Sequence, residues 1–529
     1  MSQHLLTKSV LKKISILLML FCLFSCTNTP SLKKQNAYIS VESSIASTHS
    51  AITTNVSNCE SITRRFIERI KVYDKSTNLN AITIFNNNAV DRSKLLDQEY
   101  QKTKKLRALH CIPVILKDNF DTADMPTEAG SIALKGSLPK DDAFMVKRLR
   151  EAGAIIIAKS NMGEWAFSPY NTISSTYGET LNAYNLKHVP AGSSGGTASA
   201  IAASFGIIGM GTDTGNSIRG PASHLALVGM RSTIGLTSRD GVVPLLLNRD
   251  IAGPLTRSVE DAAKTFTVIA GYDLADPITH NIYAKQKVDY TDYLSKDALQ
   301  GVRLGVIREM FESELADFEV LDLMEQAIRD LKAAGAIIVD PVSIKDFKKL
   351  SEATGFCSRF RFDLNKYLKK SATESTPIKS FQNIVDQTLF SEHNLKSIQW
   401  AASVRISPHN MQPPCVDVQG DPRRRQFLNA VVKAMNDQNI DALIYPSWSN
   451  PPTKIADSSS PHGNNSPVIA PHTGQPAITV PMGYTQGNLP AGLQFLVRPF
   501  DDAKLFGYAF AYEQQTQHRK PPILFPVLK

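Results

Sequence analysis

The sequence predicts an α/β fold built on a large, mixed and mostly parallel β-sheet that is covered on both faces by helices. Short apolar, β-branched runs alternate with amphipathic segments of helical period along most of the chain, which is the pattern of strands joined by helical crossovers. The 529 residues are 42% hydrophobic, enough to bury a large core. Charged residues make up 20% and are interspersed, which is typical of a folded chain.

Each element follows from one of these two patterns. Apolar residues at helical spacing predict a first helix from Ser61, and the buried strand predicted over 110–116 ends at Lys117. The other predicted helices are residues 144–152, 194–203, 319–333, 426–436 and 502–514. The other predicted strands are residues 154–158, 207–211, 302–307, 336–339, 442–445 and 477–480. Residues 340–420 are less regular, and we expect a variable helical insertion over the sheet.

The first 26 residues have the pattern of an export signal. Lysines precede an apolar run over 14–24, which has the length of a signal-peptide core and is short for a membrane span. The residues 23–26, Leu-Phe-Ser-Cys, resemble a bacterial lipobox, so we expect a protein exported to the cell envelope and lipid-anchored at Cys26. Thr27, in place of Asp, indicates the outer membrane by the same resemblance. Because Phe24 is bulky for a lipobox, simple secretion and an uncleaved anchor stay open.

Between this signal and the main domain, the composition changes. Residues 27–58 are rich in Ser, Thr and Asn and are predicted to form a flexible tether. A single domain then extends over 59–529. Residues 447–467 are predicted to be a long loop, and such loops often border the site of an α/β enzyme.

Charge and cysteine content exclude some functions. The formal net charge of +9 is a small excess for this length and requires no nucleic-acid partner. The three arginines at 423–425 are interpreted as a solvated helix start. The cysteines beyond residue 26 are widely spaced and form no CxxC pair, so we expect no metal site: Cys59, Cys111, Cys357 and Cys415. An oxidising compartment permits disulfides, but Cys111 lies in a predicted strand and is expected to be a free buried thiol.

Two serines and a lysine carry the chemical signal. Ser193 lies in GSSGG at 192–196, Ser217 follows a glycine-containing turn over 211–216, and Lys117 ends an apolar run. A serine nucleophile needs a base, and lysine can serve when burial lowers its pKa enough to leave it neutral. Taken singly, Lys117 could pair with Asp118, Ser217 could cap a helix, and Ser193 could be a loop residue. Together they supply a nucleophile, a proton bridge and a base for acyl transfer.

The combination resembles the amidase signature family, which are serine hydrolases with a Ser-Ser-Lys triad. The resemblance runs from about Ser61 to the end of the chain. Its motifs are LHCIPVILKDNFDT at 109–122, DDAFMVKRLREAGAIIIAKSNMGEWA at 141–166, the central signature at 189–235 and SPVIAPHTGQPAITVPMG at 466–483. The resemblance implies the amidase-signature fold. It also implies hydrolysis of a carboxylic amide, either a non-peptide amide or the C-terminal amide of a peptide.

The resemblance assigns a role to each reacting residue. Ser217 would be the acylated nucleophile, Ser193, in a cis peptide arrangement, would bridge it to the base, and Lys117 would be that base. Backbone amides would hold the oxyanion at Thr214, Gly215 and Asn216, together with Ser217. The supporting residues would be Ser194, Asp213 and Arg219. No metal or organic cofactor is implied, the partner is a small-molecule or peptide amide, and a homodimer is compatible with the family.

Two positions depart from the family's pattern. Asn216 stands where the family usually has glycine. Asparagine tolerates left-handed backbone angles better than most residues, so we expect the turn to survive, with a side chain that narrows the leaving-group side or contacts substrate. Ala191 replaces the first glycine of the usual GGSSGG, which is a mild change unless the position needs a positive φ. Neither departure removes a reacting residue.

A different nucleophile is conceivable in the same segment. GSSGG also fits the G-x-S-x-G pattern of α/β-hydrolases with Ser194 as nucleophile, but Pro190 disfavours the strand which that pattern needs. A catalytic histidine would also be required. His462 and His472 are interpreted as loop residues without a supporting pattern, and His462 as a candidate substrate contact.

Two further alternatives keep a similar fold. A glutaminase (A) subunit of a tRNA-dependent amidotransferase would share the reacting residues, but it works in the cytoplasm with partner subunits, which the export signal disfavours. A catalytically silent binding lipoprotein of the envelope would have a similar composition and anchor. It would leave Lys117, Ser193 and Ser217 unexplained as a set.

Overall fold

The computed structural model describes residues 38–457 and 462–528. The predicted export signal and Cys26 lie outside these residues. In the described part of the chain, no helix is both long and apolar enough to cross a membrane.

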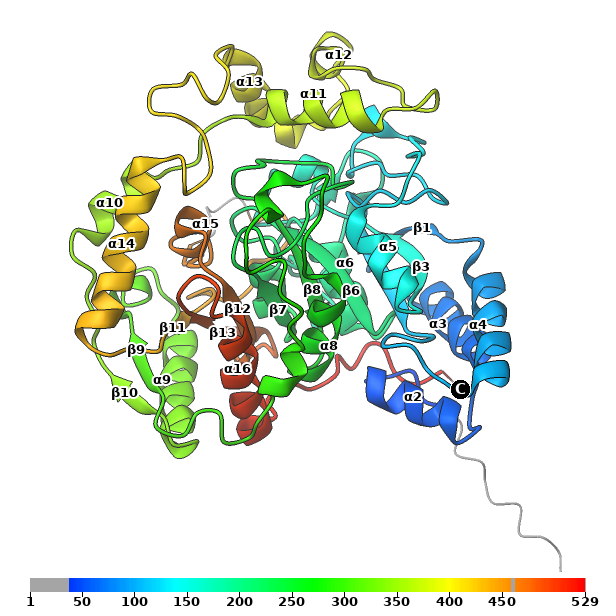
Figure 1. Cartoon of the computed structure of the whole chain (residues 1–529), viewed down its shortest axis with the longest axis horizontal. Helices are drawn as coiled ribbons and strands as arrows, with labels where there is room; N and C mark the ends of the chain where they lie inside the picture. The colour runs from blue at the N-terminus through cyan, green and yellow to red at the C-terminus, as the bar shows by residue number, and fades with distance from the viewer. Residues whose placement is uncertain (1–37, 458–461, 529) are drawn as a thin grey trace, which may run out of the picture. The chain divides into compact units, whose positions relative to one another are not determined.

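One large sheet organises the described residues (Figure 1). Its eleven strands there have the order β1-β3-β2-β6-β8-β7-β12-β13-β11-β9-β10. They are β1 (Ile82–Phe85), β2 (Pro113–Lys117), β3 (Ile155–Ser160), β6 (Ile208–Asp213), β7 (Val228–Arg231), β8 (Ile251–Thr256), β9 (Arg303–Val306), β10 (Ile337–Val339), β11 (Ala442–Pro446), β12 (Ala477–Tyr484) and β13 (Pro490–Leu496). A separate small hairpin consists of β4 (Ile173–Ser174) and β5 (Gly178–Glu179).

The sheet has two parallel blocks flanking an antiparallel centre, and the edge strand β1 pairs antiparallel with β3. β3, β2 and β6 are parallel neighbours, as are β11, β9 and β10. From β6 through β8, β7, β12 and β13 to β11 the neighbours are antiparallel. The predicted mixed sheet is therefore confirmed, but it is not mostly parallel, because most of its neighbouring strand pairs in the described residues are antiparallel. Its antiparallel centre depends on β7, β8 and β13, which the sequence pattern did not indicate as strands.

Helices cover the sheet on both faces. They are α2 (Ile45–Thr53), α3 (Cys59–Tyr73), α4 (Ala89–Thr103), α5 (Phe144–Glu151), α6 (Gly195–Ala202), α7 (Arg219–His224), α8 (Val259–Ile269), α9 (Phe318–Ala333), α14 (Pro422–Asp437), α15 (Ala470–Thr473) and α16 (Asp502–Thr516). α6 and α7 contact each other and the central strands, and α8 packs on β8 beside α16. All the predicted helices are present, and none of their predicted ends is shifted by more than four residues.

The region 340–420 is helical, as the sequence predicts. It contains α10 (Phe347–Ala353), α11 (Phe360–Ser371), α12 (Phe381–Asp386) and α13 (Leu395–Ser403). In Figure 1, α11, α12 and α13 lie together above the rest of the fold. Their apolar faces share a buried cluster with residues that follow β2 and β3, among them Leu134 and Trp165. The insertion is thus packed onto the segments that leave the sheet next to Lys117.

The predicted flexible tether is wrong over its second half. α2 begins within it, after Ser44, whose side chain accepts a hydrogen bond from the Ser47 amide in a capping box. The helix buries Ile45 and Ile52, and Asp261 accepts the amide of Ile45 at 3.1 Å. The capping box and the apolar spacing are easily missed in a segment dominated by Ser and Thr.

Two expectations for buried residues are also corrected. Cys111 forms a disulfide with Cys59, with their Cα atoms 5.1 Å apart. Cys111 has a φ of 63° and lies in the turn before β2 rather than in the strand. Arg424 is 1% exposed and donates to the carbonyls of Pro471 and His472, so the arginine run is not a fully solvated helix start. These carbonyls belong to α15, which no local pattern places beside α14.

Candidate active site

Lys117 lies at the end of β2, between β3 and β6, where all five strand residues are buried. Its Nζ donates to Ser193 Oγ at 2.7 Å and to Thr212 Oγ1 at 2.8 Å. The alternative pairing with Asp118 is not formed, because that carboxylate accepts the backbone amides of Glu128 and Gly130. The apolar run that forms β2 therefore places an amine against two hydroxyl groups inside the protein.

Burial controls the charge of this amine. Desolvation lowers the pKa of Lys117 to about 7, although the nearby Asp250 and Asp213 carboxylates raise it. An ammonium group is strongly hydrated in water, and the surrounding apolar strands replace only part of that hydration. A substantial fraction of Lys117 is therefore neutral at neutral pH and can accept a proton.

Ser193 is fixed by close packing of the GSSGG segment. The peptide bond that joins Gly192 to Ser193 is cis. A Cβ atom at residue 192 would lie 2.1 Å from the Asn171 carbonyl oxygen, and one at residue 196 would lie 2.1 Å from that of Asn161. Only glycine fits these two positions, so the glycines let the start of α6 approach the neighbouring loop. Ser194 Oγ donates to the Thr212 carbonyl at 3.2 Å and ties this segment to β6.

Ser217 lies in the turn between β6 and α7 and is 5% exposed. Within the described residues, the backbone amides of residues 214–217 bind no protein acceptor, whereas those of Ile218 and Arg219 donate to Asp213. The sequence suggested such a turn for oxyanion binding. The structure shows a set of amide donors beside a serine hydroxyl with no acceptor of their own.

A buried ion cluster holds this turn. Asp213 pairs with Arg219 at 3.0 Å and with Arg231 at 3.1 Å, and all three side chains are fully buried. Burial raises the pKa of Asp213, but the two guanidinium groups outweigh it and keep that pKa below its usual value. Arg219 also donates to the Gly215 carbonyl at 2.8 Å. Because a trans peptide directs its N–H opposite its C=O, this contact fixes the direction of the next amide, that of Asn216.

Asn216 binds the protein's own backbone. Its Nδ2 donates to the Gly192 carbonyl at 2.8 Å and to the Pro169 carbonyl at 3.0 Å. The side chain thus links the turn of Ser217 to the segment of Ser193. Asn216 does not adopt the left-handed angles that the usual glycine suggested.

Ala191, by contrast, has a φ of 61°. This position therefore favours the glycine that the family usually has there. The left-handed conformation costs an alanine about 1–2 kcal/mol.

Three contributing residues were not identified from the sequence. Thr212 accepts from Lys117 and also from Asn119 Nδ2 at 3.1 Å. Asp250 accepts the hydroxyl of Thr214 at 2.5 Å. Arg231 completes the cluster around Asp213. Thr212 lies inside the GTDTG motif and could have been proposed from it, whereas Asp250 and Arg231 have no local signal.

His462 and His472, the two histidines interpreted from the sequence as loop residues, differ in exposure and in secondary structure. His462 is exposed, and its carbonyl accepts the Trp448 indole N–H at 2.5 Å. His472 is not in a loop but in the short helix α15, where Pro471 near the helix start favours helical φ. It is buried, and its Nδ1 lies 2.9 Å from the Arg249 guanidinium.

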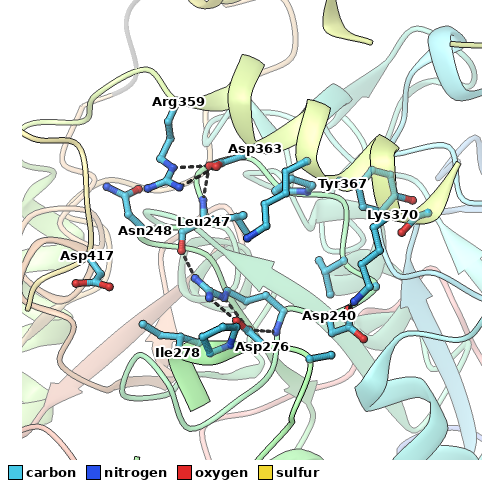
Figure 2. A pocket seen from close by; sticks show the side chains of 18 of the residues that line it. Asp240, Leu247, Asn248, Asp276, Ile278, Arg359, Asp363, Tyr367, Lys370 and Asp417 are labelled. Atoms are coloured by element: carbon cyan, nitrogen blue, oxygen red, sulfur yellow. Dashed lines mark hydrogen bonds and ion pairs between the residues drawn. The ribbon is translucent and has the colours of Figure 1, made fainter. Parts of the chain in front are cut away.

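A cavity lies beside the insertion (Figure 2). This polar cavity of about 400 Å³ is lined by acidic and basic side chains, most of them already paired, as in Arg239–Asp276 and Arg359–Asp363. None of the sequence-predicted reacting residues lines it. It shares Arg239 with a much smaller cavity that touches Thr212 and Thr214.

The matches to known proteins place this α/β chain among the hydrolases that act on carbon–nitrogen bonds. The chain belongs to the amidase family, whose model, described as Amidase, matches residues 61–506. A probable amidase of Arabidopsis thaliana is 33% identical over 462 residues, which cover 84% of this chain and 84% of the relative. The glutamyl-tRNA(Gln) amidotransferase (A) subunit of Rippkaea orientalis is 30% identical over 504 residues, covering 91% of this chain and 99% of the relative. The native peptide amidase of Stenotrophomonas maltophilia superposes with a TM-score of 0.81 at 33% identity, covering 91% of this chain and 99% of that chain.

The contact between Asn216 and Gly220 gives a test of how this turn is built. A Cβ atom at residue 220 would lie 2.1 Å from Asn216 Oδ1, and its three nearest atoms all belong to Asn216. We expect Asn216→Gly to lower the free energy of unfolding by about 1–3 kcal/mol through the two lost hydrogen bonds. We expect Gly220→Ala to be strongly destabilising alone and much less so combined with Asn216→Gly. Thermal unfolding of the four proteins measures this coupling, and additive effects of the two substitutions would contradict the contact.

Proposed function

We propose that this protein is an amidase that hydrolyses a carboxylic amide through an acyl-enzyme on Ser217. The observation that carries the proposal is the buried Lys117 amine, with its lowered pKa, hydrogen-bonded to Ser193 beside a turn of free backbone amides. A neutral lysine that is hydrogen-bonded to a serine hydroxyl can accept the proton of that hydroxyl. The backbone amides of residues 214–217, which have no acceptor among the described residues, can donate to an oxyanion.

The proposed reaction has two halves. Ser217 Oγ attacks the amide carbon while its proton passes to Ser193, whose own proton passes to Lys117. The tetrahedral oxyanion accepts from the amides of residues 214–217. The Lys117 ammonium then returns a proton through Ser193 to the leaving nitrogen, the C–N bond breaks and the amine departs. Water attacks the ester that remains on Ser217 by the same proton route and releases the carboxylic acid.

A second candidate is a glutaminase subunit of a tRNA-dependent amidotransferase. The observation that favours it is the 30% identity to the (A) subunit of such an enzyme over nearly that protein's whole length. The comparable likeness to a peptide amidase, at 33% identity, supports a free-standing amidase instead. A catalytically silent binding protein would have no use for a proton-accepting Lys117.

The nucleophile is tested with a fluorophosphonate probe and intact-protein mass spectrometry. We expect one adduct on the native protein and none on Ser217→Ala at matched thermal stability. The substitution should also lower amide turnover by roughly 10⁴-fold or more, since residues that act as one unit fail together. An adduct that persists on Ser217→Ala would assign the nucleophile elsewhere.

The two candidate functions are separated by substrate. The native protein is given a panel of primary amides and, separately, free glutamine, and ammonia release is measured. We expect turnover of panel amides by the isolated chain. Hydrolysis of glutamine alone would favour the amidotransferase role.

The base is tested by the pH dependence of kcat/KM. Lys117 accepts a proton only when neutral, and its pKa is about 7. The rate should therefore rise as pH increases through this value and level off about one unit above it. Lys117→Ala should lower kcat by roughly 10²–10⁴-fold. A rate in the native protein that still climbs above about pH 9 would indicate a lysine of ordinary pKa and a different base.

We further propose that the protein is exported and lipid-anchored at Cys26. The N-terminal pattern supports this, and so do two disulfides, which are typical of oxidising compartments. In a Gram-negative host, the native chain should incorporate a palmitate analogue and sediment with membranes. Cys26→Ala should lose the label. A labelled Cys26→Ala protein, or an unlabelled native protein in the soluble fraction, would contradict lipidation.

A further inference from the structure

An aromatic ring from the insertion lies directly on the turn that carries Ser217. A Cβ atom at Gly215 would lie 3.0 Å from Phe356 Cζ and 3.6 Å from Pro467 Cβ. A side chain at residue 215 would press on the ring, so glycine there allows this close approach of the ring to the backbone. Phe356 is nevertheless 41% exposed, so part of its ring faces solvent at the same place.

The position of the ring puts it within reach of a substrate. Gly215 is two positions before Ser217, so their Cα atoms are at most about 7.6 Å apart. The ring therefore lies on the same short turn as the proposed nucleophile, within reach of a group attached to an amide at Ser217. Tyr170, which is 39% exposed, directly follows Pro169, whose carbonyl accepts from Asn216, and its ring meets the Trp448 ring edge to face at 6.1 Å. One partly exposed aromatic ring thus lies on the turn, and a second directly follows a residue that is hydrogen-bonded to it.

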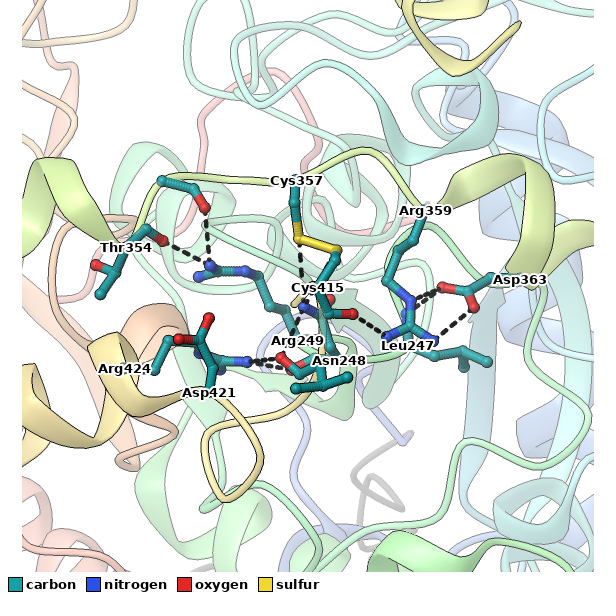
Figure 3. Close-up of a disulfide and its surroundings, with 12 residues drawn as sticks. Leu247, Asn248, Arg249, Thr354, Cys357, Arg359, Asp363, Cys415, Asp421 and Arg424 are labelled. Atoms are coloured by element: carbon teal, nitrogen blue, oxygen red, sulfur yellow. Dashed lines mark hydrogen bonds and ion pairs between the residues drawn. A yellow bond between two sulfur atoms is a disulfide. The ribbon is translucent and has the colours of Figure 1, made fainter. Parts of the chain in front are cut away.

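Arg249 holds the chain just before this ring. Its guanidinium donates to the carbonyls of Thr354 at 2.7 Å and Gly355 at 3.2 Å, as Figure 3 shows for Thr354. The guanidinium carbon lies 4.6 Å from the centre of the Phe356 ring, in cation–π contact. The His472 ring meets Phe356 edge to face at 5.3 Å. Phe356 is therefore fixed by buried groups beneath it and is not a freely rotating surface residue.

A disulfide holds the chain just after the ring. Cys357 is bonded to Cys415, 58 positions away, and Figure 3 shows the bond between the two segments of chain that enter and leave the insertion. Asn248 Nδ2 lies 3.8 and 3.9 Å from the two sulfurs and donates to the Val416 carbonyl at 3.1 Å. Helices α11, α12 and α13 lie between the two cysteines in the sequence. The disulfide thus closes the insertion at its base, next to the residue that touches the turn.

We propose that Phe356 is a specificity-determining residue whose ring forms an apolar wall beside Ser217, and that the Cys357–Cys415 disulfide positions it there. The substrate class is an amide with an aromatic or large aliphatic group close to the scissile bond. Aromatic side chains around a few directed polar groups are typical of small-molecule sites. This inference rests on the proposed amidase function and adds to it the kind of group that the site selects.

The test compares amides that differ only by a phenyl ring. One pair is propionamide and 3-phenylpropionamide, which differ on the acyl side. The other is N-methylacetamide and N-benzylacetamide, which differ on the amine side. The readout for each pair is the ratio of kcat/KM for the aromatic amide to that for the small one.

We expect the native protein to prefer the aromatic member of at least one pair. Phe356→Ala should lower that ratio by roughly tenfold or more, mainly through KM, because an apolar contact of this size is worth at least that much in a pocket. Phe356→Leu should restore part of the preference. Tyr293→Ala removes a ring of similar exposure, 47%, from a segment packed on α8 and α16, and should leave both ratios unchanged. Equal ratios in the native protein and Phe356→Ala would overturn the proposal.

The positioning role of the disulfide has its own matched control. Cys357→Ser/Cys415→Ser should shift the ratio in the same direction as Phe356→Ala, whereas Cys59→Ser/Cys111→Ser should not. An unchanged ratio in the first double variant would remove the disulfide from the proposal. If that variant does not fold, the Phe356 variants decide the role of the ring independently.

The failure of this inference can be told apart from failure of the amidase function. Fluorophosphonate labelling and turnover of any of the four amides by the native protein test the function itself. Turnover with no preference for the aromatic members, or with a preference that Phe356→Ala leaves intact, overturns only the specificity role. Absence of both labelling and turnover overturns the function and this inference with it.

Discussion

The burial of one amine at the end of β2 is the interaction on which the site depends. Lys117 is enclosed by parallel neighbours on both sides, and its only hydrogen-bond partners among the described residues are the hydroxyls of Ser193 and Thr212. A charged ammonium would be poorly solvated there, which lowers its pKa to about 7. The parallel block formed by β3, β2 and β6 therefore lowers the pKa of the amine that we propose as the base. Every other part of the site is placed relative to that strand.

The acidic groups near this amine act at a distance. Asp213 is turned away toward Arg219 and Arg231, and Asp250 accepts from Thr214 and from two backbone amides. Neither forms a salt bridge with Lys117. Their charges raise the pKa of the lysine only enough to oppose part of the burial effect, while their hydrogen bonds hold the turn that carries Ser217. The two carboxylates can thus stabilise the turn without holding Lys117 in its charged form.

The insertion shows how the least regular part of the sequence is fixed in place. Helices α11 to α13 bury their apolar faces on the segments that leave β2 and β3, and Cys357–Cys415 closes the base of the insertion. Two buried arginines also hold the ends of the insertion in place. Arg249 and Arg424 each donate to backbone carbonyls of several elements. The region that borders the reacting groups is therefore held by apolar packing, a covalent bond and charge-assisted hydrogen bonds together.

The sequence by itself determined the alternation of strands and helices, the helical insertion and the set of Lys117, Ser193 and Ser217, because these depend on local periodicity and on contiguous motifs. It did not determine the antiparallel centre of the sheet, the disulfide of Cys111 or the burial of Arg424, since each requires partners far away in the chain. The contacts of Asp250, Arg231 and Phe356 were likewise set only by the tertiary structure. Asn216 illustrates the difference best. Its place in the motif predicted a left-handed backbone angle. In the folded chain, its side-chain amide instead donates to the Gly192 carbonyl and joins two segments that lie 24 positions apart.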